Sequence, residues 1–231
     1  MPSRRPTSTL RTRRPASCAA LGLALVAGLL TPTTAEAGTT SYSAPLRTAV
    51  RALPVAVENN ASYDRDRHFG PWRDANGDCQ NTRQEVLLQE RRSTTVVYWG
   101  KDRCTVKSGR WVSSWDNRTH SLASGLQIDH TVPVAEAWGS GAKRWTQTRR
   151  RAFYNDLTDP RALSAQTSAL NFAKGARGPE AWLPPANRCR YVKDWVAVKL
   201  RWRLTVDSAE KTALTRLASS CTNVTVTVNR V

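Results

Sequence analysis

The sequence predicts a single α+β domain. Short runs of β-branched and aromatic residues between positions 94 and 132 favour antiparallel strands. The second half is mostly helical in pattern. Its clearest signal is an apolar stripe with the spacing of one helix face, on Tyr191, Trp195, Val198 and Trp202. No repeat or linker divides the 231 residues, and a hydrophobic content of 40% is enough to fill one core.

The first 37 residues have the organisation of a secretory signal peptide. Five arginines precede an apolar run from Cys18 to Leu30, and Ala35-Glu36-Ala37 offers small residues for cleavage. The run is too short for a membrane-spanning helix, which needs about 20 residues. We therefore expect a secreted, extracellular protein, exported by the Sec route rather than the twin-arginine route and free of the membrane after cleavage.

The chain carries 35 Lys and Arg against 18 Asp and Glu, a formal charge of +17. Loss of residues 1–37, with five arginines and one glutamate, would lower this charge to +13. So basic a protein indicates a polyanionic partner.

Four cysteines remain beyond the signal peptide: Cys79, Cys104, Cys189 and Cys221. An even number in an oxidising compartment predicts two disulfides. Three pairings are possible, and we favour Cys79–Cys104 with Cys189–Cys221.

The elements are expected in the following order. Residues 38–62 form an N-terminal lead-in, residues 63–79 a polar loop and residues 82–92 a helix. The runs TTVVYW, RCTV and RWVSSW, separated by Gly100-Lys101 and Ser108-Gly109, predict a small antiparallel meander. A strand over residues 126–130 precedes helices over 134–138 and 146–155. After the apolar stripe, a capping box at residues 207–210 opens a last helix, and residues 224–228 alternate as a strand.

Three histidines limit the available chemistry, and His130 has the most suggestive surroundings. In Ile128-Asp129-His130-Thr131-Val132-Pro133, an apolar strand ends in an ionisable pair. The carboxylate suits a hard divalent cation, and the neutral imidazole suits removal of a proton from water. Neighbouring strand residues point to opposite faces, so a shared site requires the strand to end or twist there. The alternative is a strand-terminal histidine beside a structural aspartate.

Further on, the chain contains Asn171-x-x-Lys174-Gly175 and then W-L-P-P at residues 182–185. The combination I-D-H-x-V-P, N-x-x-K-G and W-L-P-P resembles the secreted branch of the HNH endonucleases. These ββα-metal nucleases are related to the C-terminal nuclease domain of the GmrSD restriction enzymes. The resemblance spans roughly residues 63–220 and implies a ββα-metal core, elaborated by the meander and additional helices, within a nuclease domain of residues 63–231.

The resemblance also implies roles. Asp129 matches the metal-binding acid, His130 the general base that activates water, and Asn171 a second metal ligand. One divalent cation, with Mg²⁺ preferred over Mn²⁺ or others, would neutralise charge at phosphorus and help the 3′ oxygen leave.

Other positions carry open alternatives. Asn155 and Asp159 both fit the middle motif position, with a slight preference for Asn155. Lys174 shares a helical face with Asn171 and could reach a phosphate, or it could be a solvated surface lysine. Arg83 is expected to approach the site and bind substrate. The segment 74–85 has the acidic pattern of a calcium-binding loop, except that Cys79 stands where glycine makes the sharp turn.

These observations predict a secreted, metal-dependent endonuclease that hydrolyses DNA with little sequence specificity, with RNA as a further candidate. It would bind the phosphate backbone and act as a monomer. The competing hypothesis is a non-catalytic extracellular module that binds nucleic acid or an anionic cell-wall polymer.

Overall fold

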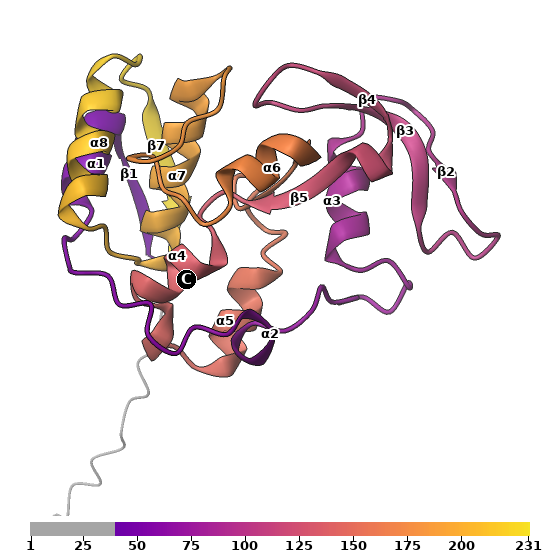
Figure 1. The fold of residues 1–231 in the computed structure, drawn as a ribbon, viewed down its shortest axis with the longest axis horizontal. Helices are drawn as coiled ribbons and strands as arrows, with labels where there is room; N and C mark the ends of the chain where they lie inside the picture. Colours follow the sequence, from indigo (N-terminus) through magenta and orange to yellow (C-terminus); the bar gives the residue numbers. More distant parts are fainter. Residues whose placement is uncertain (1–39) are drawn as a thin grey trace, which may run out of the picture. The chain divides into compact units, whose positions relative to one another are not determined.

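Helices and antiparallel strands alternate along residues 40–231, the part of the chain that the computed structural model describes (Figure 1). The predicted α+β class is confirmed. The predicted signal peptide, residues 1–37, lies outside the described residues. Among the helices of residues 40–231, none is long and apolar enough to cross a membrane.

The two ends of the described chain are paired with each other. β1 (Ser41–Pro45) runs antiparallel to β7 (Thr225–Asn229), and α1 (Leu46–Ala52) contacts α8 (Ser208–Ser219). Val226 and Val228 are buried while the other three residues of β7 are exposed, as the period-two pattern predicts. The expected lead-in therefore supplies a strand and a helix to the folded unit.

Both predicted disulfides are present. Cys79–Cys104 joins the loop before α3 (Thr82–Glu90) to the turn before β3 (Val106–Val112). Cys189–Cys221 joins the start of α7 (Arg188–Trp202) to the end of α8. The bridges span 25 and 32 residues, for which the chain-entropy estimate is about 3–4 kcal/mol each.

An antiparallel meander is present, but its strands differ from the predicted ones. The runs RCTV and RWVSSW, predicted as separate strands, both contribute to β3, and the third strand lies in residues 119–122, for which no strand was predicted. β2 (Val97–Tyr98), β3 and β4 (Thr119–Leu122) are adjacent and antiparallel. The predicted turn at Ser108-Gly109 is wrong, because both residues lie inside β3. The pairing of β3 with β4 shifts register just after Ser108, so the glycine marks a bulge. A Cβ on Gly109 would lie 2.8 Å from the ring of Trp111, which explains why the position has no side chain.

The chain contains a strand–strand–helix unit, whose first strand and helix are labelled in Figure 1. β5 (Leu126–His130) pairs antiparallel with β6 (Leu163–Thr167), and α6 (Ser168–Lys174) follows directly. β5 matches the predicted strand residue for residue. β6 carries little strand signal in its sequence, because Thr167 is its one β-branched residue and it has no aromatic residue.

Helices surround this unit. α4 (Val134–Gly139) and α5 (Gln147–Tyr154) lie between β5 and β6 in the chain, close to their predicted bounds. α7 crosses the core, and all four residues of the predicted apolar stripe are buried. Asp207 caps α8 by accepting a hydrogen bond from the Glu210 amide. Three shorter segments complete the chain: α2 (Arg65–His68), η1 (Ala123–Gly125) and η2 (Ala142–Arg144).

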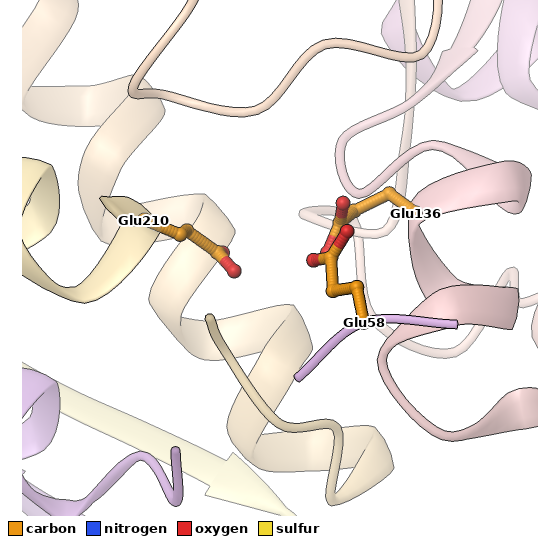
Figure 2. Close-up of side chains that lie close together, drawn as sticks. All are labelled: Glu58, Glu136 and Glu210. Atoms are coloured by element: carbon orange, nitrogen blue, oxygen red, sulfur yellow. The ribbon is translucent and has the colours of Figure 1, made fainter. Parts of the chain in front are cut away.

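A buried ionic cluster lies where α4, α7 and α8 meet. The carboxylates of Glu58, Glu136 and Glu210 lie within 4.8 Å of one another (Figure 2). Lys199 of α7 donates hydrogen bonds to Glu136 and Glu210. The ammonium group thus already holds two of the three carboxylates that a cation would use. One positive charge facing three acids leaves excess negative charge when all are ionised.

That excess favours a proton on the cluster. Burial, followed by a hydrogen bond to Glu136, raises the pKa of Glu58 from 4.5 to about 8. Burial likewise raises the pKa of Glu210 to about 7. The pKa of Glu58 is higher in the folded protein than in the unfolded chain. Glu58 therefore stabilises the fold fully below pH 4.5, and this stabilisation is lost as the pH rises through about 8.

We therefore expect Glu58→Gln to increase thermal stability more at about pH 8.5 than at about pH 5. The amide keeps a hydrogen-bond donor toward Glu136 and removes the charge that opposes folding at high pH. Melting temperatures of wild type and variant at both pH values test this, with Asp66→Asn on exposed α2 as the control. Equal shifts at the two pH values would contradict the account of the cluster.

Candidate active site

A cleft of about 620 Å³ opens beside β5. Asp129 and His130 line it from β5, Asn171 from α6 and Arg83 from α3. Four of the predicted site residues, which are far apart in the sequence, therefore share one cleft.

His130 is held by a backbone carbonyl. Its Nε2–H donates a hydrogen bond of 2.9 Å to the carbonyl oxygen of Tyr154, at the end of α5. Because a carbonyl can only accept, the neutral ring carries its proton on Nε2, and Nδ1 keeps its lone pair. This is the arrangement that a general base requires.

Aromatic rings fix the plane of the imidazole. Trp72 stacks on one side, with ring centroids 5.1 Å apart and an angle of 7°, and the Phe153 ring lies 6.0 Å away at 19°. Burial lowers the pKa of His130 to about 3, and the positive charges of Arg65 and Lys174 add to this effect. The ring is therefore neutral at pH 7. A bound phosphodiester would bring negative charge to the cleft and oppose the shift.

Asp129 forms a buried ion pair with Lys174. The Lys174 ammonium lies 2.8 and 2.7 Å from the two carboxylate oxygens and 2.7 Å from the His130 carbonyl oxygen. Lys174 is 0% exposed. Burial raises the pKa of Asp129 and lowers that of Lys174, and the pairing opposes both shifts. The sequence led us to expect that Lys174 reaches a phosphate or lies on the surface. The structure instead buries Lys174 against Asp129.

The donor set suits a hard divalent cation. Asp129 and Asn171 both line the cleft, and both have the side-chain oxygen atoms that such a cation prefers. Lys174 uses one lone pair on each Asp129 oxygen, and each oxygen can accept a second interaction. The Asn171 amide nitrogen donates to Gln127 at 2.7 Å, and its oxygen accepts no hydrogen bond from the part of the chain described.

Neither candidate for the middle motif position contacts His130 through its side chain. The Asn155 side-chain oxygen accepts from the Arg73 amide at 2.9 Å and the Thr82 hydroxyl at 2.7 Å. Asp159 pairs with Arg161 at 2.6 Å. The group that holds His130 is the carbonyl of Tyr154, the residue before Asn155. Asn155 therefore anchors the end of α5, where the Tyr154 carbonyl lies, whereas Asp159 does not.

Arg83 lies at the cleft edge, where its guanidinium donates to the carbonyls of Ala123 and Leu126. The nearby acidic loop is held by its own amides. The Asp74 carboxylate accepts from Gly77 and Cys79, at 2.8 Å in both cases.

Two cleft features have little signal in the sequence. Trp72 is one of three aromatic residues in a polar loop, and only the fold places it on His130. Arg65 lines the cleft and donates to the Tyr154 hydroxyl at 2.8 Å.

Comparison with known proteins identifies the family. Residues 81–217 match the family model described as "GmrSD restriction endonucleases, C-terminal domain". This chain belongs to that family. Family membership indicates a nuclease-like function, a nucleic acid substrate and the use of divalent metals that is general in such nucleases.

A relative from Arthroderma benhamiae, named an uncharacterized secreted protein, is 39% identical over 201 residues. The matched region covers 86% of this chain and 93% of the relative. No solved structure matches the chain.

The buried pair makes a prediction about stability. We expect Lys174→Met to destabilise the fold by about 3–5 kcal/mol, because Asp129 would remain buried without its cation. The double variant Asp129→Asn with Lys174→Met should recover much of this loss. Urea unfolding measures both, with Lys143→Met at an exposed lysine as the control. A change within about 0.5 kcal/mol for Lys174→Met, as at a solvated position, would contradict the pairing.

Proposed function

We propose that the protein is a secreted HNH-type endonuclease that hydrolyses phosphodiester bonds of DNA, and of RNA as a second substrate, with the aid of one divalent cation. The observation that carries the proposal is His130, which lines the cleft with its proton held on Nε2 by the Tyr154 carbonyl. The order of β5, β6 and α6, with Asp129 on the first strand and Asn171 on the helix, supports a ββα-metal site.

His130 is the general base. Nδ1 takes a proton from water as the water oxygen attacks phosphorus, and the bond from phosphorus to the 3′ oxygen breaks. The imidazolium that forms is stabilised because its Nε2–H bond to the Tyr154 carbonyl becomes charge-assisted. Trp72 and Phe153 keep the ring in the plane that this bond requires.

Asp129 and Asn171 would hold the cation, for which Mg²⁺ is the first candidate. When bound, it supplies charge neutralisation at the phosphate and at the departing 3′ oxygen. Lys174 keeps the Asp129 carboxylate in one orientation through two hydrogen bonds. Asn155 acts as a positioning residue, because it anchors the chain next to the Tyr154 carbonyl.

Substrate recognition is through the backbone. The formal charge without residues 1–37 is strongly positive, and Arg65 and Arg83 line the cleft. Binding of this kind tolerates many sequences and weakens steeply with salt.

We expect His130→Ala to lower plasmid cleavage by at least about 100-fold, because general-base catalysis contributes roughly that much or more. DNA binding should remain. The matched control is His120→Ala. The His120 ring is hydrogen-bonded to Thr167, and His120 is not among the residues that line the cleft. Circular dichroism verifies that both variants fold.

The cation is tested with EDTA and with Asn171→Ala, and both should stop cleavage by the otherwise active protein. Asn171 is a cleaner choice than Asp129, because removing Asp129 would leave the Lys174 charge buried and unpaired. Cleavage that persists in EDTA would reject the metal mechanism. Binding of DNA without turnover in Mg²⁺ or Mn²⁺ would instead favour a non-catalytic module.

A further inference from the structure

The β2–β3 region forms a second basic surface outside the cleft lining. Residues 91–112 contain one acidic residue, Asp102. They also contain six cationic residues, all of them exposed: Arg91, Arg92, Lys101, Arg103, Lys107 and Arg110. We call residues 91–112 the basic hairpin. Its charge is complementary to a polyphosphate chain.

The basic hairpin also exposes apolar and aromatic groups. Trp99 is 69% exposed and Val97, two residues earlier, is 56% exposed. The Lys107 ammonium lies 4.4 Å from the centre of the Trp99 ring. Aromatic rings interleaved with cations are the combination that binds single-stranded nucleic acid, since bases stack on the rings while cations neutralise phosphates.

A groove of about 320 Å³ lies beside β2. Its lining includes Leu88, Arg91, Tyr98 and Arg103, and the Arg103 guanidinium lies 5.0 Å from the centre of the Tyr98 ring. Two guanidinium groups therefore border a concave surface that contains an aromatic ring.

Helix α3 connects this groove to the catalytic cleft. Arg83 in its first turn lines the cleft, and Leu88 near its end lines the groove. Five helical residues span about 7.5 Å along the axis. Because five residues also correspond to a rotation of about 140°, the two side chains leave α3 on different sides. A nucleic-acid strand that leaves the cleft beside Arg83 would therefore pass around α3 to reach the groove.

We propose that the basic hairpin binds the substrate strand beyond the scissile phosphate, with Trp99 stacking on a base and Arg91, Arg103 and Lys107 neutralising phosphates. This inference rests on the proposed function. The proposed partner is a single strand of nucleic acid. The exposed indole can stack on its bases, whereas a polyanion without bases offers nothing to stack.

The test measures binding in EDTA of two fluorescent probes, a single-stranded oligonucleotide and inorganic polyphosphate, which has no bases. Trp99→Ala should weaken oligonucleotide binding by about 5- to 150-fold and leave polyphosphate binding unchanged. Trp99→Phe should recover part of the loss.

A triple variant, Arg91→Gln, Arg103→Gln and Lys107→Gln, should weaken binding of both probes. It should reduce the slope of log affinity against log salt by about 2 for the oligonucleotide, as expected for three lost phosphate contacts. The control replaces three exposed arginines elsewhere, Arg51, Arg144 and Arg216, with Gln. This control should change the slope less.

Two outcomes overturn the inference: a triple variant that behaves like its control, or a Trp99→Ala variant that weakens both probes equally. The second would identify a surface for polyanions in general. Cleavage assays on the same proteins separate this inference from the proposed function. Hairpin-dependent binding without cleavage would reject only the nuclease, and cleavage with hairpin-independent binding would reject only the hairpin.

Discussion

The ion pair between Asp129 and Lys174 is the contact on which the candidate site depends. It joins the end of β5 to α6, and the same ammonium bonds the His130 carbonyl. Three hydrogen bonds from one buried group therefore hold the side chain of Asp129 and the backbone of His130. Removal of either partner would leave an uncompensated charge in the interior. The geometry of the site is thus tied to the stability of the core around it.

Asp129 and His130 are neighbours in a strand, and they contact different elements for that reason. Asp129 meets α6 through Lys174, and His130 meets α5 through the Tyr154 carbonyl. Each helix supplies the group that orients one side chain. The division separates the two tasks of the proposed chemistry, cation binding and proton transfer, while both side chains still line the same cleft.

The sequence was sufficient to predict structural features whose signal is local or for which few alternatives exist. β5 and the buried stripe of α7 followed from local residue patterns. The cysteine count predicted two disulfides, and the pairing favoured among three possibilities is the one observed. The β1–β7 pairing depends on residues at opposite ends of the described chain, which no local pattern reports. The burial of Lys174 was missed because helical spacing gives its face but not its partner. The Tyr154 carbonyl was missed because a backbone atom has no residue-type signal.

The central claim is that the Tyr154 carbonyl holds the proton of His130 on Nε2 and leaves Nδ1 free to accept one from water. Long-range proton–nitrogen correlation spectra of protein labelled with ¹⁵N-histidine report the tautomer of each ring directly. The account predicts a neutral His130 at pH 7, protonated at Nε2 and unprotonated at Nδ1. A ring protonated at Nδ1, alone or together with Nε2, would contradict it.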